Sequence, residues 1–335
     1  MSPLTPSHPL ADTFGRFHHY LRISVTDRCN LRCRYCMPAD GVPLVPKSDL
    51  LTFEEITQLV GWLAEAGVSK IRLTGGEPTV RKGLPDLLGQ LKAIPGIRTL
   101  AMTSNGLLLG PVLDQLVENG LSQLNLSLDA LSPAVFRTIT RREGLENVLS
   151  VIDRALSLKE LEVKVNMVVL RGVNDHEIPD MVSYFTKRRA ELRFIEWMPF
   201  SGNEWTGDLL VSKSEILQRI SQLEPIQPVG YSDAGTGTAD QFILPESGLR
   251  IGIISSMTDH FCATCSRIRL TAEGMFKSCL FENSEIDLRT PLRAGATRHD
   301  ILNLISRKIK EKKAAHGGMH MIAQNPGRPM VAIGG

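Results

Sequence analysis

Strand-like and helix-like segments alternate along the first 200 residues of this 335-residue chain, and this alternation limits the fold more than any other feature. The strand-like runs cover residues 21–25, 70–74, 98–103, 123–128, 162–170 and 192–197. Helical periodicity covers residues 85–92, 111–119, 145–158 and 177–187, and a further helix begins after Thr52, a residue suited to cap it. Strands that alternate with helices predict a parallel sheet, either wound as a barrel or open and doubly wound.

The strand-like runs also carry a polar face, which is unusual for a parallel sheet. In several runs every second residue is polar, and these residues are Arg22, Ser24, Thr26, Lys70, Arg72, Thr74, Asn125, Ser127, Asp129, Lys164 and Asn166. Each set lies on one face of its strand, because side chains alternate between the two faces. An antiparallel sheet with one face in solvent gives the same pattern. The intervening helices favour a partly open barrel, whose cationic interior would hold an anionic ligand.

The pattern changes after about residue 201. Shorter strand-like runs follow at 242–244, 250–254 and 267–270, a loop at 232–239 and a helix from about 300 to 312. Lys plus Arg number 38 and Asp plus Glu 36, and this near balance argues against nucleic-acid binding through a large basic field. No run approaches the ~18 apolar residues that span a membrane, and the first twenty residues do not resemble a secretory signal. We therefore expect a soluble cytoplasmic protein.

Six cysteines occur in two triplets. Cys29, Cys33 and Cys36 have the spacing C-x3-C-x2-C, and Cys262, Cys265 and Cys279 have the spacing C-x2-C-x13-C. In a reducing compartment such sets are metal ligands or redox thiols more often than disulfides. Each triplet is one ligand short of a closed zinc site or of a four-cysteine iron–sulfur cluster, and His260 is a candidate fourth ligand for zinc at the second triplet.

The first triplet has a recognisable signature. Tyr35 gives the form C-x3-C-x-aromatic-C directly after the first strand, and this resembles the radical S-adenosylmethionine superfamily. The segment Thr74-Gly75-Gly76-Glu77-Pro78 resembles the superfamily segment that contacts the methionine end of the cofactor. The resemblance implies a [4Fe–4S] cluster with one open iron, which binds S-adenosylmethionine and cleaves it to a 5′-deoxyadenosyl radical.

The second triplet narrows the resemblance to one family. Together with the sequence CSRIRL at 265–270 and the final Gly334-Gly335, it resembles the GTP 3′,8-cyclase family, also called molybdenum cofactor biosynthesis protein A. The resemblance implies an incomplete (β/α)6 barrel of the radical S-adenosylmethionine type, with a C-terminal extension that carries a second [4Fe–4S] cluster. We expect a loose extension at residues 1–20, the partial barrel at 21–200 and the cluster-bearing region at 201–335.

The resemblance also implies the reaction, which is that of a lyase in the first step of molybdenum cofactor biosynthesis. The adenosyl radical abstracts the 3′ hydrogen of GTP, and the sugar radical adds to guanine C8 to give 3′,8-cyclo-7,8-dihydro-GTP. The implied partners are GTP, an electron donor, a downstream cyclic pyranopterin monophosphate synthase and a second copy of the chain in a homodimer. Nucleic acid and membranes are not expected partners.

Roles of single residues follow from the same resemblance. The ligands of the radical-forming cluster are Cys29, Cys33 and Cys36, and those of the substrate cluster are Cys262, Cys265 and Cys279. The positions near S-adenosylmethionine are Tyr35, Gly76, Ser127 and Met198. The positions near GTP are Arg22, Arg72, Thr103, Lys164, Arg267 and Arg269, with Lys70 and Arg193 as possible additions. The catalytic set is the first cysteine triplet with Arg267, Arg269, Gly334 and Gly335, because the double glycine of the family reaches into the active site.

Two other functions remain open at this point. The first is another radical S-adenosylmethionine enzyme with an auxiliary cluster, such as a peptide-modifying maturase. The second is a zinc-binding interaction protein, which would be colourless and would hold zinc. The iron content and the dependence of 5′-deoxyadenosine formation on GTP distinguish the three functions.

Overall fold

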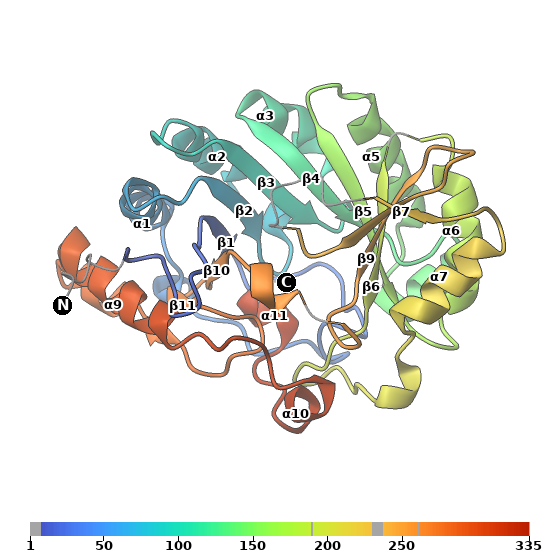
Figure 1. Ribbon diagram of the computed structural model, residues 1–335. Helices are drawn as coiled ribbons and strands as arrows, with labels where there is room; N and C mark the ends of the chain where they lie inside the picture. Colours follow the sequence, from blue (N-terminus) through green and yellow to red (C-terminus); the bar gives the residue numbers. More distant parts are fainter. Residues whose placement is uncertain (1–7, 189, 230–236, 260, 335) are drawn as a thin grey trace.

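A computed structural model describes residues 8–188, 190–229, 237–259 and 261–334. In these residues the strands form one curved, open sheet with the order β12-β11-β10-β1-β2-β3-β4-β5-β6-β9-β8-β7 (Figure 1). The eight neighbours from β10 to β9 are all parallel, and the strands beyond them are antiparallel at both edges. The alternating strand and helix order of the sequence therefore produces the parallel sheet that it predicts.

The first six strands lie close to the predicted runs. They are β1 (Tyr20–Ser24), β2 (Lys70–Thr74), β3 (Thr99–Ser104), β4 (Leu121–Ser127), β5 (Glu162–Val169) and β6 (Glu191–Glu196). The later strands are β7 (Gln227–Pro228), β8 (Asp240–Ile243), β9 (Arg250–Ile254), β10 (Arg267–Leu270), β11 (Met275–Lys277) and β12 (Ile286–Asp287). The largest difference in the first six is one or two residues at an end, where strand boundaries are least determined by pattern.

The helices between the strands cover the outer face of the sheet (Figure 1). They are α1 (Phe53–Glu65), α2 (Leu84–Lys92), α3 (Leu113–Glu118), α4 (Pro133–Thr140), α5 (Leu145–Ser157), α6 (Ile178–Phe185) and α7 (Lys213–Ser221). The C-terminal helices are α8 (Arg289–Arg293), α9 (Arg298–Lys310), α10 (Met319–Gln324) and α11 (Met330–Ile333). Among the described residues, the helices are all too short or too polar to cross a membrane.

The predicted start of α1 is confirmed. Thr52 accepts a hydrogen bond from the backbone N–H of Glu55 (3.2 Å), and the Glu55 carboxylate accepts one from the backbone N–H of Thr52 (2.8 Å). This reciprocal cap satisfies two donors that the helix end would leave unpaired. The apolar stripe of α1, which includes Ile56 and Leu59, is fully buried against the apolar face of the sheet.

The sequence prediction omitted α4 and α7, and near the C-terminus it also omitted the short helices α8, α10 and α11. Pro133 is the first residue of α4 and follows Ser132, and proline suits the first turn of a helix. Ser212 and Glu215 form a capping box at α7 like that of α1, so a helix signal was present, but the sequence analysis assigned no element to these residues.

The C-terminal strands do not form a separate sheet. β10 pairs in parallel with β1, and β9 pairs in parallel with β6, so residues after 201 extend the first six strands on both sides. These pairings join segments about 250 and 60 residues apart, which is beyond the reach of local periodicity. The division of the chain at residue 200 stays a prediction, but the sheet is continuous across it.

The prediction of a loose extension at residues 1–20 is wrong for residues 8–20. Leu10 and His18 are fully buried, and Tyr20 already belongs to β1. Arg16 donates hydrogen bonds to the carbonyl oxygens of Cys262 (2.7 Å) and Lys313 (2.7 Å). The sequence prediction failed here because the partners of this segment lie about 250 to 300 residues away.

Candidate functional site

The polar faces of the strands line a cavity of about 310 Å³ on the inner side of the sheet. The strand register sets these side chains in rows, because residues directly paired on neighbouring strands point to the same face. One row crosses β10, β1 and β2 with Arg269, Arg22 and Arg72, and the next row contains Arg267, Tyr20 and Lys70. A third row crosses β3, β4 and β5 with Thr103, Asn125 and Lys164. The predicted cationic interior is thus present as a cavity.

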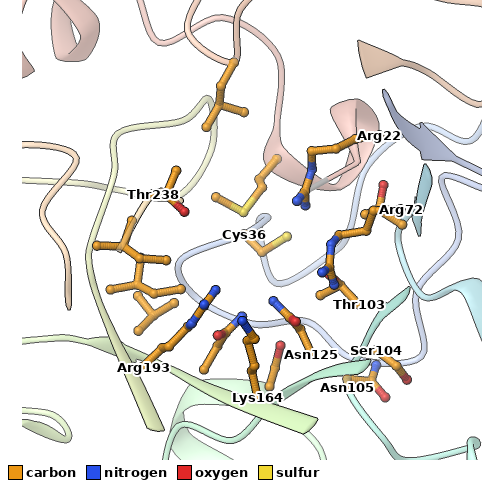
Figure 2. Close-up of a pocket in the computed structure, with 18 of the residues that line it drawn as sticks. Arg22, Cys36, Arg72, Thr103, Ser104, Asn105, Asn125, Lys164, Arg193 and Thr238 are labelled. Atoms are coloured by element: carbon orange, nitrogen blue, oxygen red, sulfur yellow. The ribbon is translucent and has the colours of Figure 1, made fainter. Parts of the chain in front are cut away.

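The cations enter this cavity from different strands (Figure 2). Arg22, Arg72, Lys164 and Arg193 direct their nitrogen ends toward its interior, and Cys36 appears between them in this view. The electrostatic field of these cations is strong enough to lower the pKa of the Tyr20 hydroxyl. Burial alone would raise the pKa of Tyr20, but Arg72, Arg22 and the other cations around it lower that pKa to about 6. At Arg22, in contrast, burial disfavours the charged guanidinium and lowers its pKa to about 9. Such a concentration of buried positive charge is costly unless an anion compensates it.

Some of these cations are held by the protein and others have unused donors. Arg72 donates to the Tyr20 hydroxyl (2.5 Å) and to the carbonyl oxygen of Met102 (2.8 Å), so it is held in place. Arg269 is 6% exposed, and its Nη1 has no hydrogen-bond partner in the described part of the chain. The Oδ1 atom of Asn125 is also buried without a partner among the described residues. Donors and acceptors that remain unsatisfied in a polar cavity are suited to a ligand.

Glu191 partly neutralises two of the cations that line the cavity. Glu191 forms ion pairs with Arg193 (2.5 Å) and Lys164 (3.2 Å), and its side chain also accepts a hydrogen bond from Gln241 (3.1 Å). Burial would raise the pKa of Glu191, but Arg193 and Lys164 lower it to about 2. Glu191 therefore stays ionised at neutral pH and helps to hold both cations, while Glu162 is a second partner of Lys164 (2.8 Å).

The first cysteine triplet lies in the loop after β1, at the carboxyl end of the parallel strands. The loop after β2 packs directly on its beginning, since a Cβ atom at Gly76 would lie 2.2 Å from the carbonyl oxygen of Arg28. Only glycine fits this approach. On the other side, two carbonyl oxygens at the end of α4 accept hydrogen bonds from this loop. Thr140 accepts from the backbone N–H of Arg32 (2.9 Å), and Ile139 accepts from that of Arg34 (3.0 Å). The loop is fixed between these two elements.

The cysteines of this triplet are partly buried and have acidic neighbours. Burial raises the pKa of Cys29 to about 11, and burial and Asp129 raise that of Cys33. The Cys29 sulfur accepts hydrogen bonds from the backbone N–H of Leu31 (3.4 Å) and from Asn105 Nδ2 (3.9 Å). Donors directed at a sulfur favour a thiolate once a metal has displaced the proton. The triplet therefore has the donor chemistry of an iron–sulfur site.

Tyr35 and Asp129 form a buried pair beside this triplet. The Tyr35 hydroxyl donates to the Asp129 carboxylate (2.8 Å), which also accepts from the backbone N–H of Val168 (2.9 Å). Burial raises the pKa of Asp129 to about 6 despite these two hydrogen bonds. Both residues line the cavity, as do Gly76, Ser127 and Met198, which completes the positions predicted near S-adenosylmethionine.

The second triplet lies at the start of β10 and the end of β11. Antiparallel pairing of these strands brings Cys265 near Cys279, and Cys262 is influenced electrostatically by both. Burial would raise the pKa of Cys265, but Lys312 and Arg267 lower it. All six cysteines of the chain are free thiols, so the disulfide alternative does not apply. His260, the candidate zinc ligand, lies outside the described residues.

Within the described ranges, no three Cys, His, Asp or Glu side chains converge on the position of a single metal ion. An iron–sulfur cluster has a different requirement, because each thiolate binds its own iron of the cluster.

The C-terminal tail reaches the first cysteine triplet. Arg328 is anchored by ion pairs to Glu273 (2.6 Å) and Glu285 (2.9 Å). Beyond this anchor the backbone of Val331 hydrogen-bonds to Cys36, and Gly334 lies against Thr74 and Ser24 at the ends of β1 and β2. The tail therefore enters the carboxyl end of the sheet, where Figure 1 shows α11. Gly335 lies outside the described residues.

Comparison with known proteins identifies the family. Residues 23–185 match the radical SAM superfamily, and residues 190–318 match the Molybdenum Cofactor Synthesis C family. The chain is 44% identical to the GTP 3′,8-cyclase of Moorella thermoacetica, over 92% of this chain and 95% of that protein. It is 48% identical to the mitochondrial GTP 3′,8-cyclase of Arabidopsis thaliana, over 98% of this chain and 84% of that one. The chain belongs to the GTP 3′,8-cyclase family.

Other relatives of this GTP 3′,8-cyclase family member are longer. The chain is 46% identical to human molybdenum cofactor biosynthesis protein 1 over 97% of its own length, but it spans only about half (51%) of that protein. Among solved structures, anSMEcpe with bound AdoMet has a TM-score of 0.62 at 15% identity, covering 91% of this chain and 80% of that chain. This likeness concerns the fold alone.

The structure brings together most of the site residues that the resemblance to the GTP 3′,8-cyclase family predicts. The first cysteine triplet lines the cavity together with Arg22, Arg72, Thr103, Lys164, Arg267 and Arg269. The cysteines of the second triplet do not line the cavity themselves, although three residues next to or near them in sequence, Phe261, Arg267 and Leu280, do. Sequence reasoning missed Tyr20, Glu191 and Lys312. Tyr20 and Lys312 gave no signal, whereas Glu191 stands two positions before Arg193 on the same strand face.

Proposed function

We propose that this chain is a GTP 3′,8-cyclase that converts GTP to 3′,8-cyclo-7,8-dihydro-GTP in molybdenum cofactor biosynthesis. The supporting observation is a single cavity with a cysteine triplet at its carboxyl end and a set of buried cations deeper in the sheet. We further propose an incomplete (β/α)6 barrel with two [4Fe–4S] clusters, a homodimer, an electron donor, a downstream cyclic pyranopterin monophosphate synthase and a cytoplasmic location.

The residues present fit the groups that this function requires. Each triplet provides three free thiols from one compact region, which leaves one iron of a four-iron cluster open for another ligand. When bound, the clusters and S-adenosylmethionine supply a 5′-deoxyadenosyl radical and an open iron. The unsatisfied Nη1 of Arg269 and Oδ1 of Asn125 supply a donor and an acceptor to a polar ligand in the same cavity.

The cations of the cavity would bind the triphosphate. A triphosphate carries about four negative charges, and guanidinium groups match its oxygens with paired donors. The two arginine rows place Arg22, Arg267 and Arg269 close together on neighbouring strands. Lys164 and Arg193, held by Glu191, provide two further cations on the opposite side of the cavity. These residues would hold the nucleotide still while its ribose faces the adenosyl group.

The protein also shields the reaction from water. The tail closes the carboxyl end of the sheet through Val331 and Gly334, and Met330 lines the cavity itself. A radical intermediate requires such exclusion of competing reactants. We propose that Gly334 and Gly335 act here as the family resemblance implies.

The test is an anaerobic assay of the iron-reconstituted protein with a reductant and S-adenosylmethionine, with GTP or without it. We expect formation of 5′-deoxyadenosine that depends on GTP, together with the cyclised product. The Cys33→Ala variant is the control and should form neither compound. Equal 5′-deoxyadenosine formation with and without GTP would reject GTP as the substrate and favour another radical SAM reaction.

A further inference from the structure

A group of buried charged residues lies behind the second cysteine triplet and has no part in the function proposed above. It consists of Asp12, Arg16, His18 and Lys312, which are all less than a tenth exposed. Arg16 joins the Asp12 carboxylate (2.5 Å) to the carbonyl oxygen of Cys262 (2.7 Å). Buried charges are retained only where hydrogen bonds and partners compensate for lost hydration. Lys312 has the most specific set of such contacts.

The ammonium group of Lys312 uses all three of its donors. It donates to His18 Nε2 (2.8 Å), to the carbonyl oxygen of Arg267 (3.1 Å) and to the sulfur of Cys265 (3.6 Å). An ammonium group has three N–H bonds and no acceptor, so this arrangement leaves it no freedom to turn away from the sulfur. Lys312 is 4% exposed, and solvent therefore does not compete for these contacts.

His18 fixes the direction of this interaction. Its Nδ1 lies 3.0 Å from the carbonyl oxygen of Leu10, which can only accept, so Nδ1 carries the proton. Nε2 is then an acceptor and receives the Lys312 donor. The series of hydrogen bonds from Leu10 through His18 and Lys312 to Cys265 therefore has one consistent set of donors and acceptors. It links the N-terminal segment to the second triplet.

Lys312 approaches the triplet from outside the substrate cavity. Arg267 and Arg269 also lower the pKa of Cys265, but both line the cavity, whereas Lys312 and His18 do not. A change at Lys312 thus alters the charge at the sulfur without removing a side chain from the cavity wall. This separates its contribution from that of the substrate-binding cations.

We propose that Lys312 is a positioning residue of the second cysteine site, where its buried charge and its hydrogen bond to Cys265 stabilise the reduced state of the bound cluster. This rests on the proposed function, which places a [4Fe–4S] cluster on Cys262, Cys265 and Cys279. Reduction adds negative charge, and a buried cation at contact distance favours the more negative state. Hydrogen bonds to sulfur and local net charge are among the factors that set cluster potentials.

The test is a redox titration followed by electron paramagnetic resonance. The full chain carries alanine at Cys29, Cys33 and Cys36, so that the second cluster alone contributes the signal. Lys312→Met should lower the ratio of reduced to oxidised cluster at least tenfold at a fixed solution potential, which for one electron corresponds to about 59 mV. Lys312→Arg keeps the charge and should restore most of the wild-type ratio.

Lys308→Met is the matched control. Lys308 lies in α9, four residues before Lys312, and is also buried (2% exposed). Its ammonium group contacts Glu282, Ser284 and Glu311 and no cysteine. A merely structural effect of losing a buried lysine would appear in both Met variants. A shift confined to Lys312→Met supports the inference, and an unchanged ratio in that variant overturns it.

The two proposals fail in different ways. If the chain with three alanines binds no iron, the second cluster of the proposed function is rejected. If it binds iron and Lys312→Met leaves its potential unchanged, only the role of Lys312 is rejected. Should Lys312→Met fail to retain iron, Lys312→Gln, which keeps an N–H donor without the charge, is titrated instead and judged by the same two outcomes.

Discussion

Substitution of Gly334 by alanine tests whether the tail is part of the active site. Gly334 has φ +74°, and a Cβ atom there would lie 2.6 Å from Thr74 Oγ1 and 2.9 Å from Ser24 Cβ. The first distance is about 0.8 Å short of ordinary van der Waals contact, which begins at 3.4 Å. The tail must therefore move by nearly 1 Å or leave the site. Displacements of about 1 Å reduce the rates of well-positioned reactions by roughly 100-fold, and we expect that loss in kcat/KM.

Gly248→Ala is the matched control for backbone strain. Gly248 has φ +72°, but nothing lies within 4 Å of a Cβ atom there. Both variants should lose about 1 to 2 kcal/mol because alanine disfavours positive φ, so both should melt at temperatures lower by a few degrees. The rate of GTP-dependent 5′-deoxyadenosine formation is measured for each at equal iron content. If Gly334→Ala is as active as Gly248→Ala, the tail does not position the reaction.

Three other predictions concern the substrate, the clusters and stability. Arg269→Met should weaken GTP binding about 10- to 100-fold in calorimetric titration, because it removes a charged hydrogen-bond donor, while the exposed Arg137→Met should leave binding unchanged; equal affinities would remove Arg269 from the site. Cys33→Ala and Cys265→Ala should each reduce the iron content from about eight to about four atoms per chain, and full iron in either variant would contradict the assignment of its triplet. Burial and Lys312 lower the pKa of His18 to about 4. The folded state therefore resists protonation of His18. The free energy of unfolding should be highest above pH 6.5, fall by about 2 kcal/mol by pH 5 and continue to fall toward pH 4. Urea unfolding of His18→Phe should lack this contribution, and identical pH dependence in both proteins would contradict it.

Local patterns were sufficient to predict the first six strands and many of the side chains that line the cavity. The period-two alternation of Arg22 with Leu21 and Ile23 assigned a polar face to β1, and the structure places Arg22 in the cavity. The spacing of the first cysteines predicted one site because the three residues lie within a loop of eight. In each case the information is carried by neighbouring residues, and backbone geometry alone converts it into proximity.

Long-range pairing could not be predicted in this way. The row that joins Arg22 to Arg269 exists because β10 pairs with β1 in one register, and a slip by one residue would turn Arg269 away from the cavity. Residues 8–20 were misjudged for the same reason. Their composition is that of a loose end, and their packing depends on Lys312 and Cys262, which no local pattern connects to them.

The two cysteine sites differ in their electrostatic surroundings, and this difference can sort the two proposed ligands. Burial followed by Asp129 raises the pKa of Cys33, and burial outweighs the surrounding hydrogen bonds at Cys29, where Glu77 raises the pKa further. At Cys265 the cations Lys312 and Arg267 outweigh burial and lower the pKa. S-Adenosylmethionine carries a sulfonium cation and is attracted to the acidic side, whereas a triphosphate is attracted to the cationic side. The difference in charge across the cavity therefore favours S-adenosylmethionine at the first triplet and GTP toward the second. It disfavours the arrangement in which the two ligands are exchanged.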